Sequence, residues 1–468
     1  MKYISTRGRA PALPFDDVLL AGLAEDGGLY VPETLPHFSE ADIRSFRGLP
    51  YGELAVRVMW PFIGGSLHED DFAEMVADSY AAFGHPAVAP LKQLGGSLWL
   101  LELFHGPTLS FKDYALQLVG RLFDHILRQR GRRITIVCAT SGDTGSAAIE
   151  ACRDRDAIDV FVLHPKGRIS EVQRRQMTTV TAPNVRNIAI EGTFDDCQDL
   201  LKALFNDPVF RDRYQLGAVN SINWARIMAQ VAYYFVAAVA LGAPGRKVSF
   251  AVPTGNFGNV HAAYVARRMG LGVEGFIVGS NRNDILTRFF EGGSMDMVPV
   301  TPTLSPSMDI QVSSNFERLL FDFFGRDGER LAALMERFRN EGSVAIGAER
   351  RRRIGRLFVG HRLDDDETRA AIRRLFDTTG EMLDPHTAIG VTAAEARRKE
   401  GASPIVAVAT AHPAKFPDAV EQAIGIRPAL PARLADLYDR EEHCHVVPND
   451  LDSVRDFIAG CLNGRTTA

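Results

Sequence analysis

A lysine with hydrophobic neighbours is the first residue in this sequence that could do covalent chemistry. Lys112 lies in Leu109-Ser110-Phe111-Lys112-Asp113, at the expected start of a helix, and is one of eight lysines among 53 basic residues. Burial and the positive end of a helix both disfavour an ammonium ion, so an uncharged amine able to form a Schiff base is expected. The alternative is a lysine that extends to water and pairs with Asp113.

Two loops rich in glycine and small polar residues could bind anions. They read Pro253-Thr254-Gly255-Asn256-Phe257-Gly258-Asn259 and Ser141-Gly142-Asp143-Thr144-Gly145-Ser146, and each follows an expected strand and leads into a helix. Such loops can point several N–H groups at one anion beside a helix N-terminus. The first lacks the glycine spacing of a dinucleotide fingerprint, and the second lacks the lysine of a P-loop. Either loop alone could be a tight strand-to-helix turn.

Together, an activated amine, a phosphate cradle and a second anion cradle form a recognisable combination. Pyridoxal phosphate requires the first two, because its aldehyde bonds a lysine and its phosphate needs a fixed anion site. The second cradle is then expected to hold the carboxylate of an amino acid.

An α/β fold must position these segments. From Leu98 onward, short hydrophobic runs alternate with stretches of helical period, and an amphipathic helix is expected over 113–130, ended by Gly131. The runs predict strands buried on both faces of a largely parallel sheet, at 98–104, 134–140, 158–163, 185–190, 248–252, 276–279 and 405–410. Open α/β sheets bind ligands at the carboxyl ends of their strands, where all three segments begin.

The motifs taken together resemble the threonine synthase family, in its longer bacterial and fungal form, among the fold-type II enzymes that use pyridoxal phosphate. The resemblance rests on the three segments above and on Tyr3-Ile4-Ser5-Thr6-Arg7-Gly8, Asp26-Gly27-Gly28-Leu29-Tyr30-Val31-Pro32 and Ala409-Thr410-Ala411-His412-Pro413-Ala414-Lys415-Phe416. It implies an α/β fold similar to the tryptophan synthase β subunit, with two open, mostly parallel sheets flanked by helices. We expect an N-terminal region (1–95), a large cofactor-binding domain (96–130 and 225–468) and a smaller substrate-closing domain (131–224).

The resemblance also implies roles for individual residues. Lys112 is expected to form the Schiff base and to act as the catalytic base, and Thr410 to face the pyridine nitrogen. Asp143 is expected beside the cofactor 3-hydroxyl; much of the wider fold type has asparagine there, so its protonation state is left open. The cofactor phosphate is assigned to Gly255, Asn256, Phe257, Gly258 and Asn259, and the substrate carboxylate to Ser141, Gly142, Thr144 and Gly145.

A fourth segment could bind a phosphate group of the substrate. Asn220-Ser221-Ile222-Asn223-Trp224-Ala225-Arg226 places amide and hydroxyl donors at a helix start, with an arginine on the first turn. The alternative is an N-capping Asn223 with a surface Arg226. The family resemblance assigns Asn220, Ser221, Asn223 and Arg226 to the substrate phosphate. The implied reaction converts O-phospho-L-homoserine and water into L-threonine and phosphate, the last step of threonine biosynthesis.

Other functions remain open. A related lyase, such as a threonine or serine dehydratase or a phospho-lyase, would share the cofactor residues, although a dehydratase has no substrate phosphate to bind. A non-catalytic metabolite-binding scaffold would be expected to lack the lysine. His443-Cys444-His445 does not predict a zinc site, because adjacent residues cannot all point at one tetrahedral ion.

Composition and charge narrow the class of partner. The net charge is −5, and the run Arg350–Arg353 is offset by Asp364–Asp366, so neither nucleic acid nor a membrane surface is an expected partner. The beginning of the chain has no signal-peptide pattern, and five widely spaced cysteines fit a reducing compartment. We expect a cytoplasmic enzyme, monomeric or homodimeric, that acts on a small molecule without a metal.

Overall fold

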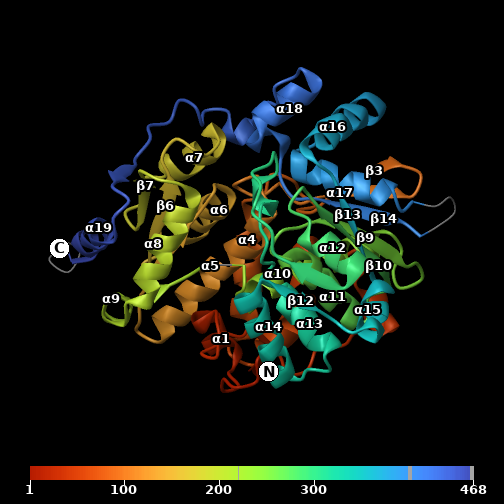
Figure 1. Ribbon diagram of the computed structural model, residues 1–468, viewed down its shortest axis with the longest axis horizontal. Coiled ribbons are helices and arrows are strands. Elements are labelled where there is room, and N and C mark those ends of the chain that lie inside the picture. Colours follow the sequence, from red (N-terminus) through yellow and green to blue (C-terminus); the bar gives the residue numbers. More distant parts are fainter. Residues whose placement is uncertain (220, 399–402, 464–468) are drawn as a thin grey trace. The chain divides into compact units, whose positions relative to one another are not determined.

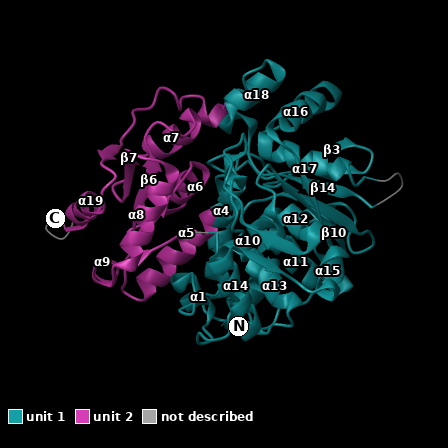
Figure 2. Cartoon of the chain, in the orientation of Figure 1, with its two compact units in different colours: residues 1–115, 221–429 teal, residues 116–220, 430–468 magenta. Residues whose placement is uncertain are grey.

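The computed structural model describes residues 1–219, 221–398 and 403–463 (Figure 1). The chain divides into two compact units, of which unit 1 contains residues 1–115 and 221–429 and unit 2 contains residues 116–220 and 430–468 (Figure 2). The division differs from the sequence expectation. Residues 116–130 group with unit 2 instead of the large domain, and residues 221–224 group with unit 1 instead of the smaller domain. The first 95 residues group with unit 1 instead of forming a region of their own, and residues 430–468 group with unit 2 instead of the large domain.

Unit 1 is built on a six-stranded sheet with the strand order β13-β10-β9-β14-β4-β3. All neighbours are parallel except β3 and β4, which pair antiparallel at one edge. The strands are Leu91–Gly95 (β3), Leu98–Glu102 (β4), Val248–Pro253 (β9), Val273–Ser280 (β10), Phe358–Arg362 (β13) and Ile405–Ala409 (β14). The strands predicted within this unit are therefore confirmed, with ends that differ by at most a few residues.

Helices cover both faces of this sheet, because its hydrophobic strands present buried side chains in both directions. On one face, Ile405 and Ala407 of β14 belong to a core shared with α17 (Pro385–Glu395). On the other face, the ring of Phe250 in β9 lies 4.7 Å from that of Tyr234 in α10 (Trp224–Ala240).

The other elements of unit 1 lie around this sheet (Figure 1). Two small antiparallel sheets are formed by β1 (Tyr3–Ser5) with β2 (Tyr30–Pro32), and by β11 (Ser294–Asp296) with β12 (Ser343–Ala345). The helices of the first 115 residues are α1 (Phe15–Ala21), α2 (Glu40–Ser45), α3 (Tyr51–Ile63) and α4 (Glu69–Ala81). The later helices are α11 (Gly258–Arg268), α12 (Ile285–Gly292), η1 (Pro306–Met308), α13 (Phe316–Phe323), α14 (Gly328–Glu341), α15 (Ala348–Gly355), α16 (Asp365–Thr379), η2 (Pro413–Lys415) and α18 (Pro417–Ile424).

Unit 2 has a five-stranded parallel sheet with the order β15-β7-β6-β5-β8. Its strands are Ile134–Ala139 (β5), Ile158–Pro165 (β6), Val185–Ile190 (β7), Leu216–Gly217 (β8) and His445–Val447 (β15). Its helices are α6 (Asp143–Cys152), α7 (Glu171–Thr178), α8 (Phe194–Asn206), α9 (Pro208–Arg213), η3 (Ala432–Leu434) and α19 (Leu451–Asn463). The predicted helix over 113–130 is α5 (Lys112–Gln129), most of which belongs to this unit.

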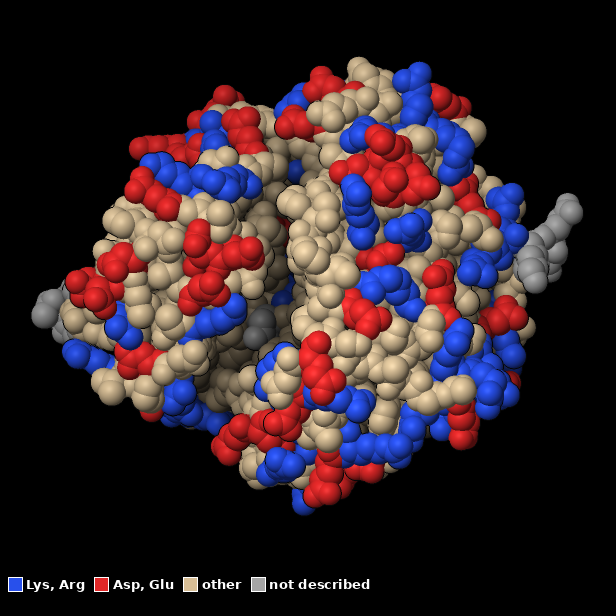
Figure 3. Space-filling model, in the orientation of Figure 1, with Lys and Arg blue, Asp and Glu red and all other residues tan. Residues whose placement is uncertain are grey.

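The surface carries charges of both signs. On the face in Figure 3, acidic and basic side chains are interspersed over both units. The arginine run lies on α15, where Arg351, Arg352 and Arg353 are exposed, as expected for a solvated helical face. None of the helices formed by the described residues combines the length and the hydrophobicity that crossing a membrane requires.

Candidate active site

The carboxyl ends of three neighbouring parallel strands bring most of the predicted cofactor residues together. Strand β14 pairs with β9 on one side and with β4 on the other, so all three strands end at the same edge of the sheet. The loop 254–259 follows β9, Thr410 follows β14, and the segment that leads to Lys112 follows β4. The structure thus places these three segments side by side in unit 1.

Backbone hydrogen bonds tie the segment before Lys112 to the segment after β14. The N–H of Phe111 donates to the carbonyl oxygen of Thr410 at 2.9 Å, and the N–H of His412 donates to Leu109 at 3.0 Å. Lys112 is the first residue of α5. The hydroxyl of Thr410, a buried residue, has no hydrogen-bond partner in the described part of the chain, which leaves it available to a ligand.

Asp113 stabilises the turn that precedes α5. Its carboxylate accepts hydrogen bonds from the N–H and hydroxyl of Thr108, at 2.8 and 2.6 Å, while the ammonium of Lys415 donates to the Thr108 carbonyl at 2.7 Å. Burial raises the pKa of Asp113 to about 6, against the lowering effect of Thr108 and Lys415. Gly106 is required here because a Cβ atom would lie 2.4 Å from that of Asp113.

The loop 255–258 has the features of a phosphate site. The carbonyl oxygen of Gly255 accepts from the Ser313 hydroxyl at 2.6 Å, and that of Asn256 accepts from the backbone N–H of Asn315 at 3.1 Å. Within the described part of the chain, the N–H groups of residues 255–258 have no acceptor. Phe257 adopts a left-handed backbone at φ 60° and caps α11. A loop with engaged carbonyls and unengaged N–H groups at a helix start fits the phosphate of pyridoxal phosphate.

Two predicted phosphate residues have side chains that pack into the core beneath the loop. The ring of Phe257 is fully buried and packs edge-on against Phe316, with centroids 5.1 Å apart. The side-chain oxygen of Asn259 accepts from the hydroxyls of Tyr233, at 2.7 Å, and Tyr234. Phe257 can therefore contribute only its backbone, whereas the buried amide nitrogen of Asn259 has no partner among the described residues and can donate to a ligand.

Asn315, which sequence reasoning missed, joins two of the predicted segments. Its side-chain amide, fully buried, donates to the carbonyl oxygens of Asn256 at 3.0 Å and Ser221 at 3.1 Å. The preceding Ser313 and Ser314 also bond the loop, to Gly255 and Asn256 respectively. The one signal in the sequence was a polar cluster directly before the hydrophobic helix α13.

The predicted substrate-phosphate segment is only partly arranged as expected. Asn223 is the N-cap of α10: its oxygen accepts from Ala225 N–H at 3.0 Å, and its amide donates to Leu19 at 2.8 Å. Arg226 is buried, with 4 % of its surface exposed, so the alternative of a surface arginine is wrong. Asn220 lies outside the described residues. Substrate binding by Ser221, Asn223 and Arg226 stays a prediction.

The second anion loop belongs to unit 2 and is ordered by Thr140. The hydroxyl of Thr140 accepts from the N–H groups of Gly142 and Gly145, both at 2.9 Å, and thus closes the turn into α6. Asp143 is buried, and its carboxylate accepts from the amide of Gln173 at 2.7 Å. The half-buried hydroxyls of Ser141 and Thr144 have no hydrogen-bond partner among the described residues. They remain available for a carboxylate.

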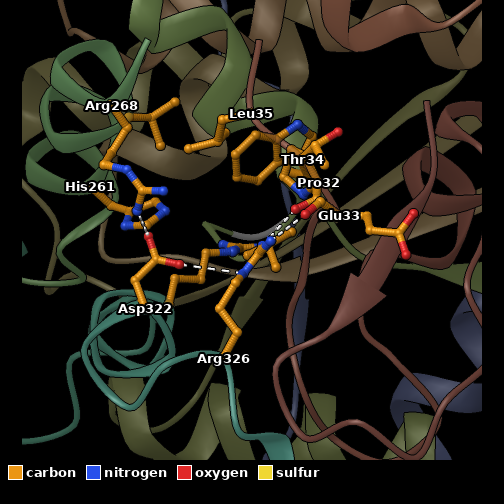
Figure 4. Close-up of a pocket in the computed structure, with 12 residues that line it drawn as sticks. Pro32, Glu33, Thr34, Leu35, His261, Arg268, Asp322 and Arg326 are labelled. Carbon is orange, nitrogen blue, oxygen red and sulfur yellow. Dashed lines mark hydrogen bonds and ion pairs between the residues drawn. The ribbon is translucent and has the colours of Figure 1, made fainter. Parts of the chain in front are cut away.

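A cavity of about 270 Å³ in unit 1 is lined by other residues than those predicted from the sequence (Figure 4). Its arginines are already engaged: Arg268 pairs with Asp322 at 2.7 Å, and Arg326 donates to the carbonyl of Pro32 at 2.6 Å. Arg318 donates to the carbonyl of Tyr30, and burial lowers its pKa to about 9. We assign the cavity no part in the reaction.

Comparison with known proteins decides the family. Models described as "Threonine synthase N terminus", "Pyridoxal-phosphate dependent enzyme" and "Threonine synthase, C-terminal" match residues 2–80, 85–348 and 387–458. The threonine synthase of Pseudomonas aeruginosa is 58 % identical over 460 residues, covering 98 % of each chain. The chain belongs to the threonine synthase family. The Schizosaccharomyces pombe member is 40 % identical over 497 residues, covering 99 % of this chain and 95 % of its own.

Solved structures of threonine synthases support the same assignment. The PLP-bound enzyme from Brucella melitensis shares 53 % identity, with a TM-score of 0.97 over 98 % of this chain and 99 % of its own. The expected fold-type II architecture is therefore confirmed, and the chain is a pyridoxal-phosphate-dependent enzyme.

Proposed function

We propose that this enzyme converts O-phospho-L-homoserine and water into L-threonine and phosphate. In the net reaction the bond between Cγ and the phosphate oxygen and one Cβ–H bond break, a Cβ–O bond to the oxygen of water forms, and a proton takes the place of phosphate on Cγ. The observation that carries the proposal is the common sheet edge that places Lys112, Thr410 and the loop 255–258 side by side, in a chain 58 % identical to a named threonine synthase.

The residues at this edge suit pyridoxal phosphate. Lys112 would hold the cofactor aldehyde, the N–H groups of 255–258 its phosphate and Thr410 its pyridine nitrogen. Asp143, which belongs to unit 2, is assigned to the 3-hydroxyl by the family resemblance alone. A hydroxyl such as that of Thr410 does not enforce a protonated pyridine as a carboxylate would. When bound, the cofactor delocalises the negative charge that develops on the substrate α-carbon.

The chain's own residues then divide the remaining work. The Lys112 amine, once released, takes the proton from the substrate α-carbon. Ser141 and Thr144 would donate hydrogen bonds to the substrate carboxylate, aided by the N–H groups at the start of α6. Arg226, with Ser221 and Asn223, would bind the substrate phosphate, for which a guanidinium is the best-suited side chain.

The test is a product analysis with purified, cofactor-loaded protein and O-phospho-L-homoserine. We expect threonine and phosphate in equal amounts; mainly 2-oxobutyrate would instead indicate a dehydratase-like elimination. Lys112→Ala should abolish both products, and borohydride should no longer attach the cofactor to the peptide that contains residue 112. Lys202→Ala, which removes an exposed lysine paired with Asp199, is the control and should behave as the wild type.

We further propose that the enzyme works in the cytoplasm as a monomer or homodimer. In support, none of the five cysteines forms a disulfide with another described residue, as is usual in proteins of a reducing compartment. Cell fractionation and light scattering of the purified protein test the two statements separately.

A further inference from the structure

Asp384 is a fully buried carboxylate that the proposed reaction does not use. It precedes α17 and caps it, accepting from the N–H groups of His386 at 2.9 Å and Thr387 at 3.3 Å. The two side chains of these residues also bond it: Nδ1 of His386 at 2.8 Å from Oδ1, and the Thr387 hydroxyl at Oδ2. A helix cap needs only the backbone contacts, so the two side-chain contacts call for a separate explanation.

The Thr387 contact leads to the residue expected at the pyridine nitrogen. A hydroxyl has one proton, which Thr387 donates to Asp384, so its lone pairs remain free to accept. One of them accepts from the backbone N–H of Thr410 at 3.2 Å. The carbonyl of Thr410 in turn accepts from Phe111, next to Lys112. Asp384 thus fixes the position of Thr410 through one intervening side chain.

The His386 contact leads to the phosphate loop. Because Nδ1 donates to Asp384, Nε2 is the acceptor, and it lies 3.4 Å from the N–H of Ser307. The carbonyl oxygen of Ser307 packs on Gly255 so closely that a Cβ there would be 2.6 Å away. His386 therefore holds residues 306–308 against the loop that is expected to bind the cofactor phosphate.

We propose that Asp384 is a positioning residue for the cofactor, acting on Thr410 through Thr387 and on the Gly255 loop through His386 and Ser307. One buried carboxylate would then set the distance between the pyridine end and the phosphate end of the site. The inference rests on the proposed function, since it takes the roles of Thr410 and the loop from there.

The contacts through Thr387 (the hydroxyl arm) and through His386 (the imidazole arm) should have different consequences. Both can be measured without turnover. Thr387→Val removes the hydroxyl arm and should shift the absorbance maximum of the bound cofactor or its pH profile, with Thr387→Ser restoring the wild-type values. His386→Leu removes the other arm and should raise the cofactor dissociation constant about tenfold, the equivalent of one or two lost hydrogen bonds, with an unchanged absorbance maximum. Asp384→Asn should show both effects.

Asp364→Asn is the matched control. Asp364 caps α16 in the same way, accepting from Glu367 N–H at 2.9 Å, but it is exposed and has no side-chain arm toward the site. It should change the melting temperature alone. If Asp384→Asn also changes the melting temperature alone, Asp384 is only a helix cap and the proposal is overturned. If Asp384→Asn does not fold, unchanged spectra and cofactor affinities in the Thr387 and His386 variants overturn it equally.

Wild-type protein separates this proposal from the proposed function. Failure of the wild type to take up pyridoxal phosphate would overturn both. Normal uptake and threonine formation by the wild type, with no effect in the variants, would overturn the role of Asp384 alone.

Discussion

Asn315 holds Asn256 by two hydrogen bonds to the same carbonyl oxygen, one from its backbone N–H at 3.1 Å and one from its side-chain amide at 3.0 Å. This double contact turns the carbonyl of Asn256 toward the protein. The peptide N–H groups of the loop are then directed away from Asn315, as a phosphate site requires. The loop conformation thus depends on a residue 59 positions further along the chain.

Replacement of Asn315 by alanine should weaken cofactor binding. The side chain loses its bonds to Asn256 and Ser221, and the buried guanidinium of Arg318 loses its acceptor on Asn315. We expect the dissociation constant of pyridoxal phosphate to rise by about tenfold or more, from equilibrium titration of the apoenzyme.

Asn184→Ala is the matched control for this variant. Asn184 is also buried, and its amide likewise donates to backbone carbonyls, those of Cys152 and Ile158, but in unit 2. It should lower the melting temperature without changing cofactor affinity. Equal cofactor affinities of the Asn315 variant and the wild type would contradict our account of the loop.

Gly255→Ala tests the close approach on the other side of the loop. The new methyl group would lie 2.6 Å from the Ser307 carbonyl, so the loop or residues 306–308 must shift. We expect cofactor affinity to fall by at least about tenfold, since a displaced loop carries its backbone N–H groups away from the position of the phosphate. Gly355→Ala is the control, because a Cβ at Gly355 meets nothing within 4 Å. An unchanged affinity for Gly255→Ala would show that the Ser307 contact is unimportant.

The sheet and the residues next to it could be predicted because their signals are local. The strands that were predicted are mainly hydrophobic segments, and the loop 255–258 and the segment that leads to Lys112 each follow one of them. The family resemblance added the roles of these residues, which the physical pattern alone left open.

Long-range contacts explain what the sequence did not reveal. Residues 430–468 join unit 2 through β15, a strand of three residues whose first two are exposed, and through pairs such as Arg174 with Glu442 at 2.8 Å. No local sequence pattern predicts that this segment pairs with unit 2. Asn315 was missed because its partners Asn256 and Ser221 are distant in sequence. Among the described residues, the Asp384 carboxylate bonds only the nearby His386 and Thr387, so the sequence predicts no more than a helix cap, and its links to the site arise from the contacts of these two residues with Ser307 and Thr410.

Arg226→Gln should impair substrate binding selectively. Removing a charge-assisted contact to phosphate typically costs about 1.5–3 kcal/mol, so KM for O-phospho-L-homoserine should rise about 10- to 100-fold. Inorganic phosphate should become a weaker inhibitor, while the absorbance of the bound cofactor stays unchanged. The KM of Arg226→Lys should lie between that of the wild type and that of Arg226→Gln, because lysine keeps the charge and loses the bidentate geometry. A lower kcat with an unchanged KM would contradict a phosphate-binding role.

The raised pKa of Asp113 predicts that unit 1 becomes less stable as pH rises. Burial lifts this pKa from 3.8 to about 6, so the folded state binds more protons than the unfolded state in that interval. The contribution of protonated Asp113 to the free energy of unfolding is fully present below about pH 4 and is lost as pH rises through 6. The loss amounts to about 3 kcal/mol at most. Asp113→Asn cannot ionise and should lack this loss.

Urea unfolding from pH 4 to 7, followed by tryptophan fluorescence, measures this difference for unit 1, which contains all three tryptophans, Trp60, Trp99 and Trp224. The stability of the wild type relative to Asp113→Asn should decrease steadily over this range. Asp364→Asn, an exposed aspartate in the same unit, controls for the loss of one negative charge. The free energy of unfolding of the wild type relative to Asp113→Asn could instead stay constant or increase as pH rises. Thr108 and Lys415 would then outweigh burial and hold Asp113 ionised throughout.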